Sequence, residues 1–300
     1  MKNYKFLLDP MRIPFLILTP ACVLLGLATA WWRSGSVNWF HFTLAMIGAL
    51  ASHISVNSFN EYFDSQSGLD ELTKRTPFSG GSGRLQQSPE MARPTLIMAW
   101  GFLFLIAGIG LYFAVAVGPE ILTLGLLGLL IIYFYTTWVT RFTFLCLISP
   151  GLGFGTLMVM VTQFALTVSY SWTAFGASLI PFFLVSNLLL LNQFPDVEAD
   201  RRIGRQHYPI QIGRTQSSRI YLAFLVLPFV VILIGSTSGI FPLTGLIGLL
   251  GILLVVPIFK GILSHAEDIE NLVPVMGQNV LLNLAAPVLL SVGFFIEPLF

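Results

Sequence analysis

Residues 57–84 read NSFNEYFDSQSGLDELTKRTPFSGGSGR and pass from an apolar, helix-like run into a loop rich in glycine and serine. Asn60, Asp64 and Asp70 lie at the end of the apolar run and just beyond it, and basic residues follow them in the loop. Acids, amides and bases at this density are costly at a membrane boundary, so their presence indicates a function. A second stretch, residues 192–214, reads NQFPDVEADRRIGRQHYPIQIGR and repeats the pattern.

The composition around these stretches is that of a membrane protein. The chain has 300 residues, of which 55% are hydrophobic and only 10% charged, against about 25% charged in soluble domains. It therefore indicates a polytopic membrane protein and excludes a soluble domain with one anchor. Cys22 and Cys146 lie in apolar segments without metal-like spacing, which favours packing and leaves the redox compartment open. The net charge of +1 does not indicate a partner, and we expect no nucleic acid.

Hydropathy predicts an all-α chain with nine transmembrane helices, each about 18–25 residues long. The predicted spans are residues 13–32, 39–63, 95–117, 120–139, 144–168, 172–194, 219–237, 241–262 and 276–297. The first apolar run is too long for the core of a typical signal peptide, so we expect a retained helix. Two links, 64–94 and 195–218, are long and polar.

The distribution of charge predicts the orientation. With the N-terminus in the cytoplasm, all of the 15 lysine and arginine residues except Arg33 fall on the cytoplasmic side. Among the acids, only Glu120 and Glu297 fall outside. This asymmetry predicts an N-in, C-out topology with the chemistry at the cytoplasmic face.

The polar residues of the two stretches are spaced for one helix face. Asn60 and Asp64 are four residues apart, and a helix end is expected at Gly68, before Asp70. Asn192, Asp196 and Asp200 are also spaced by four. The two motifs look like matching halves of one site within a single domain, 1–300.

The oxygen-rich composition of the motifs, without histidine or cysteine at ligand spacing, favours Mg²⁺ over zinc. Basic residues beside the acids would suit a substrate that carries phosphates, such as a diphosphate held through metal ions. These basic residues are Lys74, Arg75, Arg84, Arg201, Arg202, Arg205 and Arg214. Alternatively, some of them are only positive-inside signals, and the acids are charges of surface loops.

The motifs carry a resemblance. Asn60, Asp64, Gly68 and Asp70 match N-x-x-x-D-x-x-x-G-x-D, and Asp196 with Asp200 matches D-x-x-x-D. Both motifs, and their positions after the second and sixth spans, resemble the UbiA superfamily of membrane-embedded prenyltransferases. The resemblance covers the whole chain and implies nine helices in one bundle around a central cavity that opens to the cytoplasm.

The resemblance also implies a reaction. An isoprenyl diphosphate would be held by Mg²⁺ on acids of both motifs, its allylic C–O bond would ionise, and an electron-rich acceptor would capture the carbocation. The implied metal ligands are Asp64, Asp70, Asp196 and Asp200, supported by Asn60 and Asn192. The implied diphosphate contacts besides the amides are Lys74, Arg75, Arg84, Arg201 and Arg205.

Aromatic rings would stabilise the carbocation by cation–π attraction. The candidates are Tyr62, Tyr133, Tyr135 and Trp138, each of which could instead belong to a membrane-interface belt or the core. His53, seven residues before Asn60, is a candidate on the acceptor side or a helix-packing residue. His207 and a metal-free carboxylate are further candidate bases.

The first motif and the loop 76–84 most resemble the branch that prenylates 1,4-dihydroxy-2-naphthoate in menaquinone synthesis. That branch implies an aromatic acceptor, recognised by the loop, and a bacterial-type plasma membrane. Other acceptors of the superfamily stay open: 4-hydroxybenzoate, homogentisate or a glycerol-phosphate lipid.

The position of the charges argues against a secondary transporter. A transporter would place ionisable groups near mid-span, whereas here they lie at helix ends.

Pro195 argues against one regular helix through the second motif. It directly precedes Asp196, so we expect the sixth span to break there or a new short helix to begin.

Overall fold

The computed structural model describes residues 8–73 and 75–297, and the side chain of Asp70 lies outside the described part. The described residues form helices and contain no strand. In chain order the helices are η1 (Ile13–Ile17), α2 (Leu18–Ser34), α3 (Trp39–Ser67), α4 (Leu69–Leu72), α5 (Arg84–Gln87), η2 (Pro89–Met91), α6 (Ala92–Ala116), α7 (Ile121–Thr137), η3 (Val139–Arg141), α8 (Thr143–Gly151), η4 (Leu152–Leu157), α9 (Met158–Thr167), α10 (Trp172–Arg202), α11 (Tyr208–Ile212), α12 (Arg214–Thr237), η5 (Leu243–Gly251), α13 (Ile252–His265) and α14 (Ile269–Ile296).

Eight helical segments in the described residues are long and apolar enough to cross a membrane. They are Ile13–Ser34, Trp39–Ser67, Pro89–Ala116, Thr143–Thr167, Trp172–Arg202, Arg214–Thr237, Leu243–His265 and Ile269–Ile296. The predicted span 120–139 is the apolar helix α7, which has only 17 residues and is about 26 Å long at 1.5 Å per residue. The multi-pass membrane character is therefore confirmed, while the count of nine spans and the orientation stay predictions.

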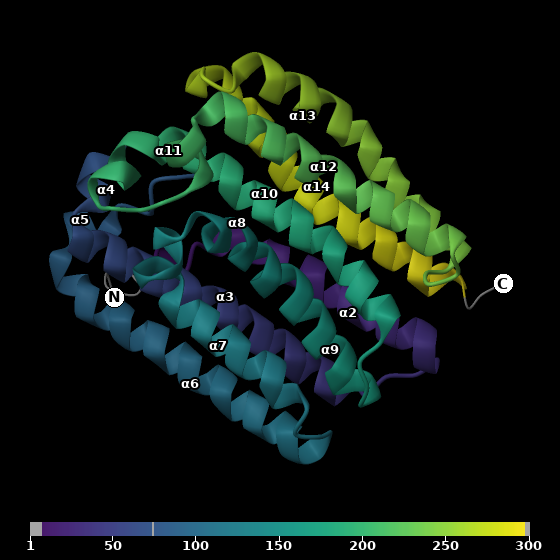
Figure 1. Cartoon of the computed structure of the whole chain (residues 1–300). Coiled ribbons are helices and arrows are strands. Elements are labelled where there is room, and N and C mark those ends of the chain that lie inside the picture. The colour runs from purple at the N-terminus through teal and green to yellow at the C-terminus, as the bar shows by residue number, and fades with distance from the viewer. Residues whose placement is uncertain (1–7, 74, 298–300) are drawn as a thin grey trace.

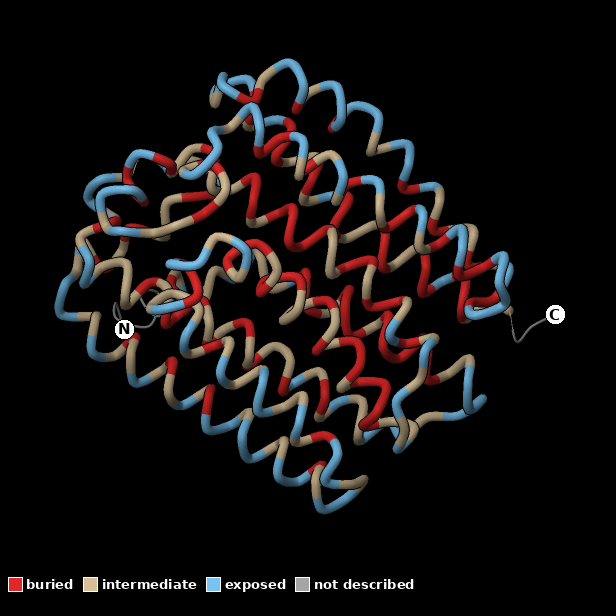
Figure 2. The backbone as a smooth tube through the Cα atoms, in the orientation of Figure 1, coloured by how far each residue is buried: buried red, intermediate tan, exposed pale blue. Residues whose placement is uncertain are grey.

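The long helices form one bundle in which α10 lies between two groups (Figure 1). Helices α12, α13 and α14 lie on one side of α10, and α3, α6 and α7 on the other (Figure 1). The short helices α4, α5 and α11 gather at one end of the bundle. The tube in Figure 2 is buried mainly along the middle of the bundle and exposed along its outer helices.

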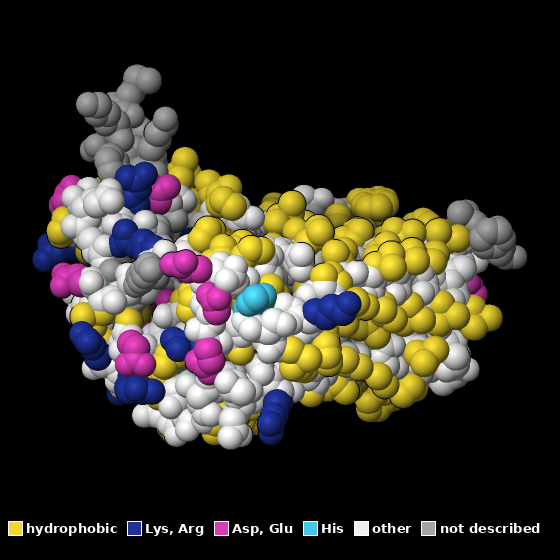
Figure 3. Space-filling view, turned by 90° about the horizontal axis from the view of Figure 1, so that it is seen from above, with side chains coloured by type: hydrophobic (Ala, Val, Ile, Leu, Met, Phe, Trp, Pro, Cys, Tyr) yellow, Lys and Arg dark blue, Asp and Glu magenta, His cyan; other side chains and the backbone are white. Residues whose placement is uncertain are grey.

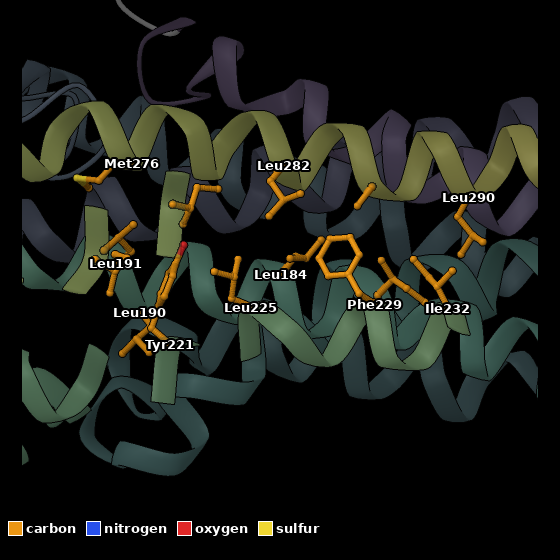
Figure 4. Packing of buried hydrophobic residues seen from close by; sticks show 14 of the residues in the cluster. Leu184, Leu190, Leu191, Tyr221, Leu225, Phe229, Ile232, Met276, Leu282 and Leu290 are labelled. Carbon is orange, nitrogen blue, oxygen red and sulfur yellow. The ribbon is translucent and has the colours of Figure 1, made fainter. Parts of the chain in front are cut away.

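The core on one side of α10 is a continuous apolar cluster, in which side chains of α10, α12 and α14 point toward one another (Figure 4). The labelled members are Leu184, Leu190, Leu191, Tyr221, Leu225, Phe229, Ile232, Met276, Leu282 and Leu290. On another face, Gly151 and Gly155 lie against the backbone of Phe182, where an added Cβ would overlap it. This contact supports close helix packing as the reason for Gly151 and Gly155, whereas a Cβ added at Gly153 would meet no atom within 4 Å.

Charge is concentrated at one end of the bundle. In Figure 3 the lysine, arginine, aspartate and glutamate side chains gather at the end that carries the short helices, and apolar side chains cover most of the rest of that view. Such an apolar surface fits a helical bundle whose long axis crosses a bilayer. We call the charged end the polar end.

Both motif helices reach the polar end with defined ends. Helix α3 begins after Asn38, whose side chain accepts hydrogen bonds from the backbone of Phe40 and His41, and it ends at Gly68. Gly68 has φ of 73°, a left-handed conformation that glycine adopts without strain. The predicted helix end at Gly68 is therefore confirmed.

The predictions for Pro195 were wrong. Helix α10 continues through Pro195 to Arg202, eight residues beyond the predicted end of the span at 194, and no new helix begins at Pro195. Proline removes one backbone donor, which leaves the carbonyl of Leu191 without its usual helical partner. The carbonyl of Phe194, the residue directly before Pro195, accepts a hydrogen bond of 2.8 Å from Nε of Arg214. The helix therefore keeps the residues 192, 196 and 200 on one face.

Candidate active site

The two acidic motifs meet at the polar end. The last turns of α3 and α10 line a polar cavity of about 110 Å³, together with the loop after α4 and the link after α10. The polar residues that line it are Arg12, Asn60, Asp64, Thr73, Ser79, Tyr135, Thr140, Asn192, Gln193, Asp196, Asp200, Arg205 and His207. The structure therefore brings together the described members of both motifs.

Arg205 joins the two motifs directly. Its Nη1 lies 3.0 Å from Oδ1 of Asp200, and its Nη2 donates to Oδ1 of Asp64. Gly204, with φ of 80°, turns the chain back after α10, so that the guanidinium reaches the cavity. Burial alone would lower the pKa of Arg205, but the carboxylates of Asp64 and Asp200 raise it above its ordinary value. Arg205 thus places a positive charge between the two acids.

His207 holds the other oxygen of Asp200. The His207 Nε2 lies 3.0 Å from Oδ2 of Asp200, and the histidine side chain is buried. Its Nδ1 is buried without a hydrogen-bond partner. Both oxygens of Asp200 are therefore engaged by side chains of the link after α10, which orients this carboxylate.

Asn192 and Asp196 carry unused oxygens into the same region. Oδ1 of each is buried and has no hydrogen-bond partner. Because a buried polar atom without a partner is costly, two such atoms on one helix face favour a ligand that supplies positive charge or donors. On α3, Asn60 Oδ1 instead accepts a hydrogen bond from Oγ1 of Thr136.

The donor set fits a hard divalent cation, but the described side chains are not arranged around one. No group of three or more His, Cys, Asp or Glu side chains in the described residues is close enough to hold a metal ion. The guanidinium of Arg205 stands between Asp64 and Asp200 and separates these two predicted ligands. Asp70 lies in α4, directly after the turn at Gly68.

Two residues that the sequence motifs do not include, Glu61 and Arg12, form contacts next to the site. Glu61 is buried within α3, and its carboxylate accepts hydrogen bonds from the backbone N–H (2.7 Å) and hydroxyl (2.8 Å) of Ser82. It also pairs with Arg12, whose Nη2 lies 2.9 Å away. Glu61 therefore ties the N-terminal segment and the glycine-rich loop to α3. The signal of Glu61 in the sequence is an acid beside Asn60 within an apolar run, whereas Arg12 has no signal beyond the asymmetry of charge.

The predicted basic residues do not all reach the polar cavity. Arg84 pairs with Asp9 at 2.6 Å, and exposed Arg201 lies 3.6 Å from Glu198 on the outer face of α10. The exposed Arg75 donates to the carbonyl of Gly80 and to Gln86. Lys74 lies outside the described residues. Among the predicted lysine and arginine contacts that the structure describes, Arg205 alone lines the cavity.

A second, mainly apolar cavity of about 550 Å³ adjoins the polar one. Six residues line both cavities: Arg12, Asn60, Phe78, Tyr135, Leu189 and Asn192. We call the smaller cavity the polar chamber and the larger, deeper one the apolar chamber. Such a pair suits a molecule with an anionic head and an apolar tail.

The aromatic candidates differ in position. Tyr135 lines both cavities, whereas Tyr62 and Tyr133 line neither. The ring of Tyr133 packs 5.5 Å from that of Phe59, in a cluster between α3, α6 and α7. Trp138 is exposed at the end of α7.

His53 lines the apolar cavity rather than the polar one. Its Nδ1 lies 2.9 Å from Oγ1 of Thr19, and its ring is 4.5 Å from that of Phe154. These contacts hold His53 in helix packing while one side of it faces the cavity.

The glycine-rich loop forms a separate polar cavity of about 450 Å³ with the N-terminal segment. Within the loop, Oγ1 of Thr76 accepts the backbone N–H of Ser79 at 3.0 Å. Phe78 lines all three cavities, so one ring lies where the loop, the polar chamber and the apolar chamber meet.

A multi-pass helical bundle with acids, amides and a buried arginine next to a deep apolar cavity has the features of a membrane enzyme. Comparison with known proteins agrees. Residues 19–267 match the model of the UbiA prenyltransferase family. The chain therefore belongs to the UbiA prenyltransferase family, and it is a prenyltransferase rather than a transporter.

Curated relatives include 1,4-dihydroxy-2-naphthoate octaprenyltransferase of Escherichia coli (strain K12), which is 25% identical over 97% of this chain and 95% of its own length. The 2-carboxy-1,4-naphthoquinone phytyltransferase of Synechocystis sp. is 22% identical over 77% of this chain and 74% of its own length.

Solved structures share the fold. A digeranylgeranylglyceryl phosphate synthase has a TM-score of 0.68 at 15% identity, covering 98% of this chain and 99% of its own. A UbiA homologue from Archaeoglobus fulgidus bound to DMAPP and Mg²⁺ has a TM-score of 0.61 at 14% identity, covering 95% and 99%. These similarities confirm the all-helical fold.

Proposed function

We propose that the protein transfers an isoprenyl chain from an allylic diphosphate to 1,4-dihydroxy-2-naphthoate or a related quinone precursor, with Mg²⁺ as cofactor. The observation that carries the proposal is that the polar and apolar cavities adjoin and share six lining residues, so that the diphosphate head and the tail of one donor would each have a cavity. The naphthoate acceptors named for the curated relatives support the choice of acceptor.

The head of the donor would lie in the polar cavity. Asp64, Asp196 and Asp200, with Asp70 and the amides of Asn60 and Asn192, would hold the divalent cation. When bound, the cation would supply positive charge to the diphosphate oxygens as the C–O bond breaks. Buried Oδ1 atoms of Asn192 and Asp196 that lack partners are the observation that supports this donor set.

Arg205 would turn from Asp64 and Asp200 to the leaving diphosphate once cations neutralise the acids. A guanidinium matches phosphate oxygens in a bidentate manner, so this shift would place its charge where negative charge develops. His207 would keep Asp200 oriented during the exchange. Arg75, Arg84 and Arg201 do not line the polar cavity, whereas Arg205 and Arg12 do, so we assign the diphosphate first to Arg205 and Arg12.

The allylic carbocation would form at the junction of the two cavities. Tyr135 lies at this junction and is the aromatic ring that we propose to stabilise the cation. The apolar walls would exclude water, which would otherwise capture the cation. The acceptor would approach from the side of Phe78 and the loop 76–84, which faces its own polar cavity. With the predicted topology, this side lies in the cytoplasm.

The acceptor is tested by incubating membranes that contain the protein with an isotope-labelled allylic diphosphate, Mg²⁺ and one acceptor at a time. The panel is 1,4-dihydroxy-2-naphthoate, 4-hydroxybenzoate, homogentisate and a glycerol phosphate. We expect a labelled lipid, identified by mass spectrometry, with the naphthoate and none in EDTA. Product with the glycerol phosphate alone would overturn the aromatic acceptor but not the prenyl transfer.

A further inference from the structure

The apolar cavity runs deep along one face of α3. The α3 residues that line it recur at steps of one and three positions: Ala45, Gly48, Ala49, Ser52, His53, Val56, Asn57 and Asn60. This spacing marks one continuous helix face. Ala45 and Asn60 are 15 residues apart, which is about 22 Å of helix. The cavity therefore extends from the polar chamber through most of a ~30 Å hydrocarbon core.

Two glycines widen the deep end of this cavity. Gly110 of α6 and Gly125 of α7 both line it, and a Cβ added to either would meet no atom within 4 Å. Both lie far from the polar chamber. Ile109, next to Gly110, packs against Gly48, which lies 12 residues before Asn60 in α3, and Gly125 is one turn from the start of α7.

Close packing does not explain these two glycines. At Gly151 and Gly155 an added Cβ would overlap the neighbouring helix, whereas at Gly110 and Gly125 it would project into open space. A glycine inside a helix destabilises it by about 1 kcal/mol relative to alanine. At Gly110 and Gly125 no contact in the protein offsets this cost, so the empty volume itself is the feature that the two glycines create.

We propose that Gly110 and Gly125 set the length of isoprenyl chain that the enzyme accepts, because they keep open the space for the distal isoprene units. The inference rests on the proposed function, since it places the diphosphate at the polar chamber and the tail below it. The tail is the occupant because the cavity adjoins the polar chamber at Asn60, Asn192 and Tyr135 and is lined mainly by apolar residues.

The test compares Gly110→Leu with Gly108→Leu, a matched control. Gly108 lies in the same helix, also has no atom within 4 Å of an added Cβ, and lines neither cavity. Positions two apart on a helix differ by about 200°, so the same leucine side chain points into the cavity in one variant and away from it in the other. The kcat/KM is measured with dimethylallyl, geranyl, farnesyl and geranylgeranyl diphosphates and one acceptor.

For each variant, the kcat/KM with the longest donor that the native protein uses is divided by the kcat/KM with dimethylallyl diphosphate. We expect Gly110→Leu to lower this ratio by roughly tenfold or more, as a blocked apolar pocket does. Gly125→Leu, from the other helix, should shift the ratio in the same direction, and Gly108→Leu should leave it as in the native protein. Equal profiles for all variants, or an equal loss with every donor, would overturn the proposal. Failure of the native protein to use any donor would instead overturn the proposed function.

Discussion

Asp196→Asn is expected to lower the kcat/KM of prenyl transfer by about a hundredfold or more, because charge stabilisation by a bound metal is worth several kcal/mol and each 1.36 kcal/mol is a factor of ten. The substitution keeps the shape of the side chain but removes the negative charge beside an oxygen that has no partner in the protein. Turnover is measured in membranes with saturating Mg²⁺, so that a weakened metal site alone does not hide residual chemistry.

Glu198→Gln is the matched control for this variant. Glu198 lies on the same helix, two residues further along, but it is exposed and contacts only Arg201 among the ion pairs of the described residues. The control should keep native turnover, and both variants should keep the native melting temperature in detergent. Native turnover by a folded Asp196→Asn protein would remove the second motif from the site.

Arg205→Met should destabilise the metal-free protein by about 3–5 kcal/mol, the usual cost of leaving buried charges without their partner. Arg205 is the shared partner of Asp64 and Asp200, and both carboxylates lie in a mostly buried cavity. The melting temperature in detergent with EDTA measures the loss. Added Mg²⁺ should recover part of it, because a cation between the two acids replaces the missing positive charge.

Arg201→Met provides the comparison, because Arg201 is exposed and forms a surface ion pair of 3.6 Å with Glu198. Such a pair is worth roughly 0–1 kcal/mol, so this variant should melt as the native protein does with or without Mg²⁺. If Arg205→Met and Arg201→Met had the same melting temperature in EDTA, Arg205 would not be the cation that holds the two motifs in place.

Much of the fold could be predicted because the bilayer limits the possible elements. The apolar runs gave each long helix to within a few residues at most ends, since a spanning segment must satisfy its own backbone groups. The end of α10 was predicted wrongly at 194, because the rule for proline considers only local hydrogen bonds. Packing of a long buried helix against its neighbours outweighs the single bond that Pro195 removes.

The members of the site could be predicted from spacing, but their connections could not. Asp64 and Asp200 were each recognisable as part of a helix-face motif, yet their joint partner, Arg205, follows from how the link after α10 turns at Gly204. The same holds for Glu61, whose partners Arg12 and Ser82 lie far from it in the chain. Sequence spacing describes one helix at a time, and contacts between distant segments depend on tertiary packing.

The central claim is that the diphosphate lies in the polar chamber while the tail lies in the apolar one. A photoreactive geranyl diphosphate with a diazirine at the end of its tail tests it, when cross-linked to the purified protein with Mg²⁺ and mapped by mass spectrometry. We predict labels on residues that line the apolar cavity in the ranges 106–113 and 121–132, and strong loss of labelling in Asp196→Asn. Labels confined to the outer surface of the bundle, unchanged by that substitution, would contradict the account.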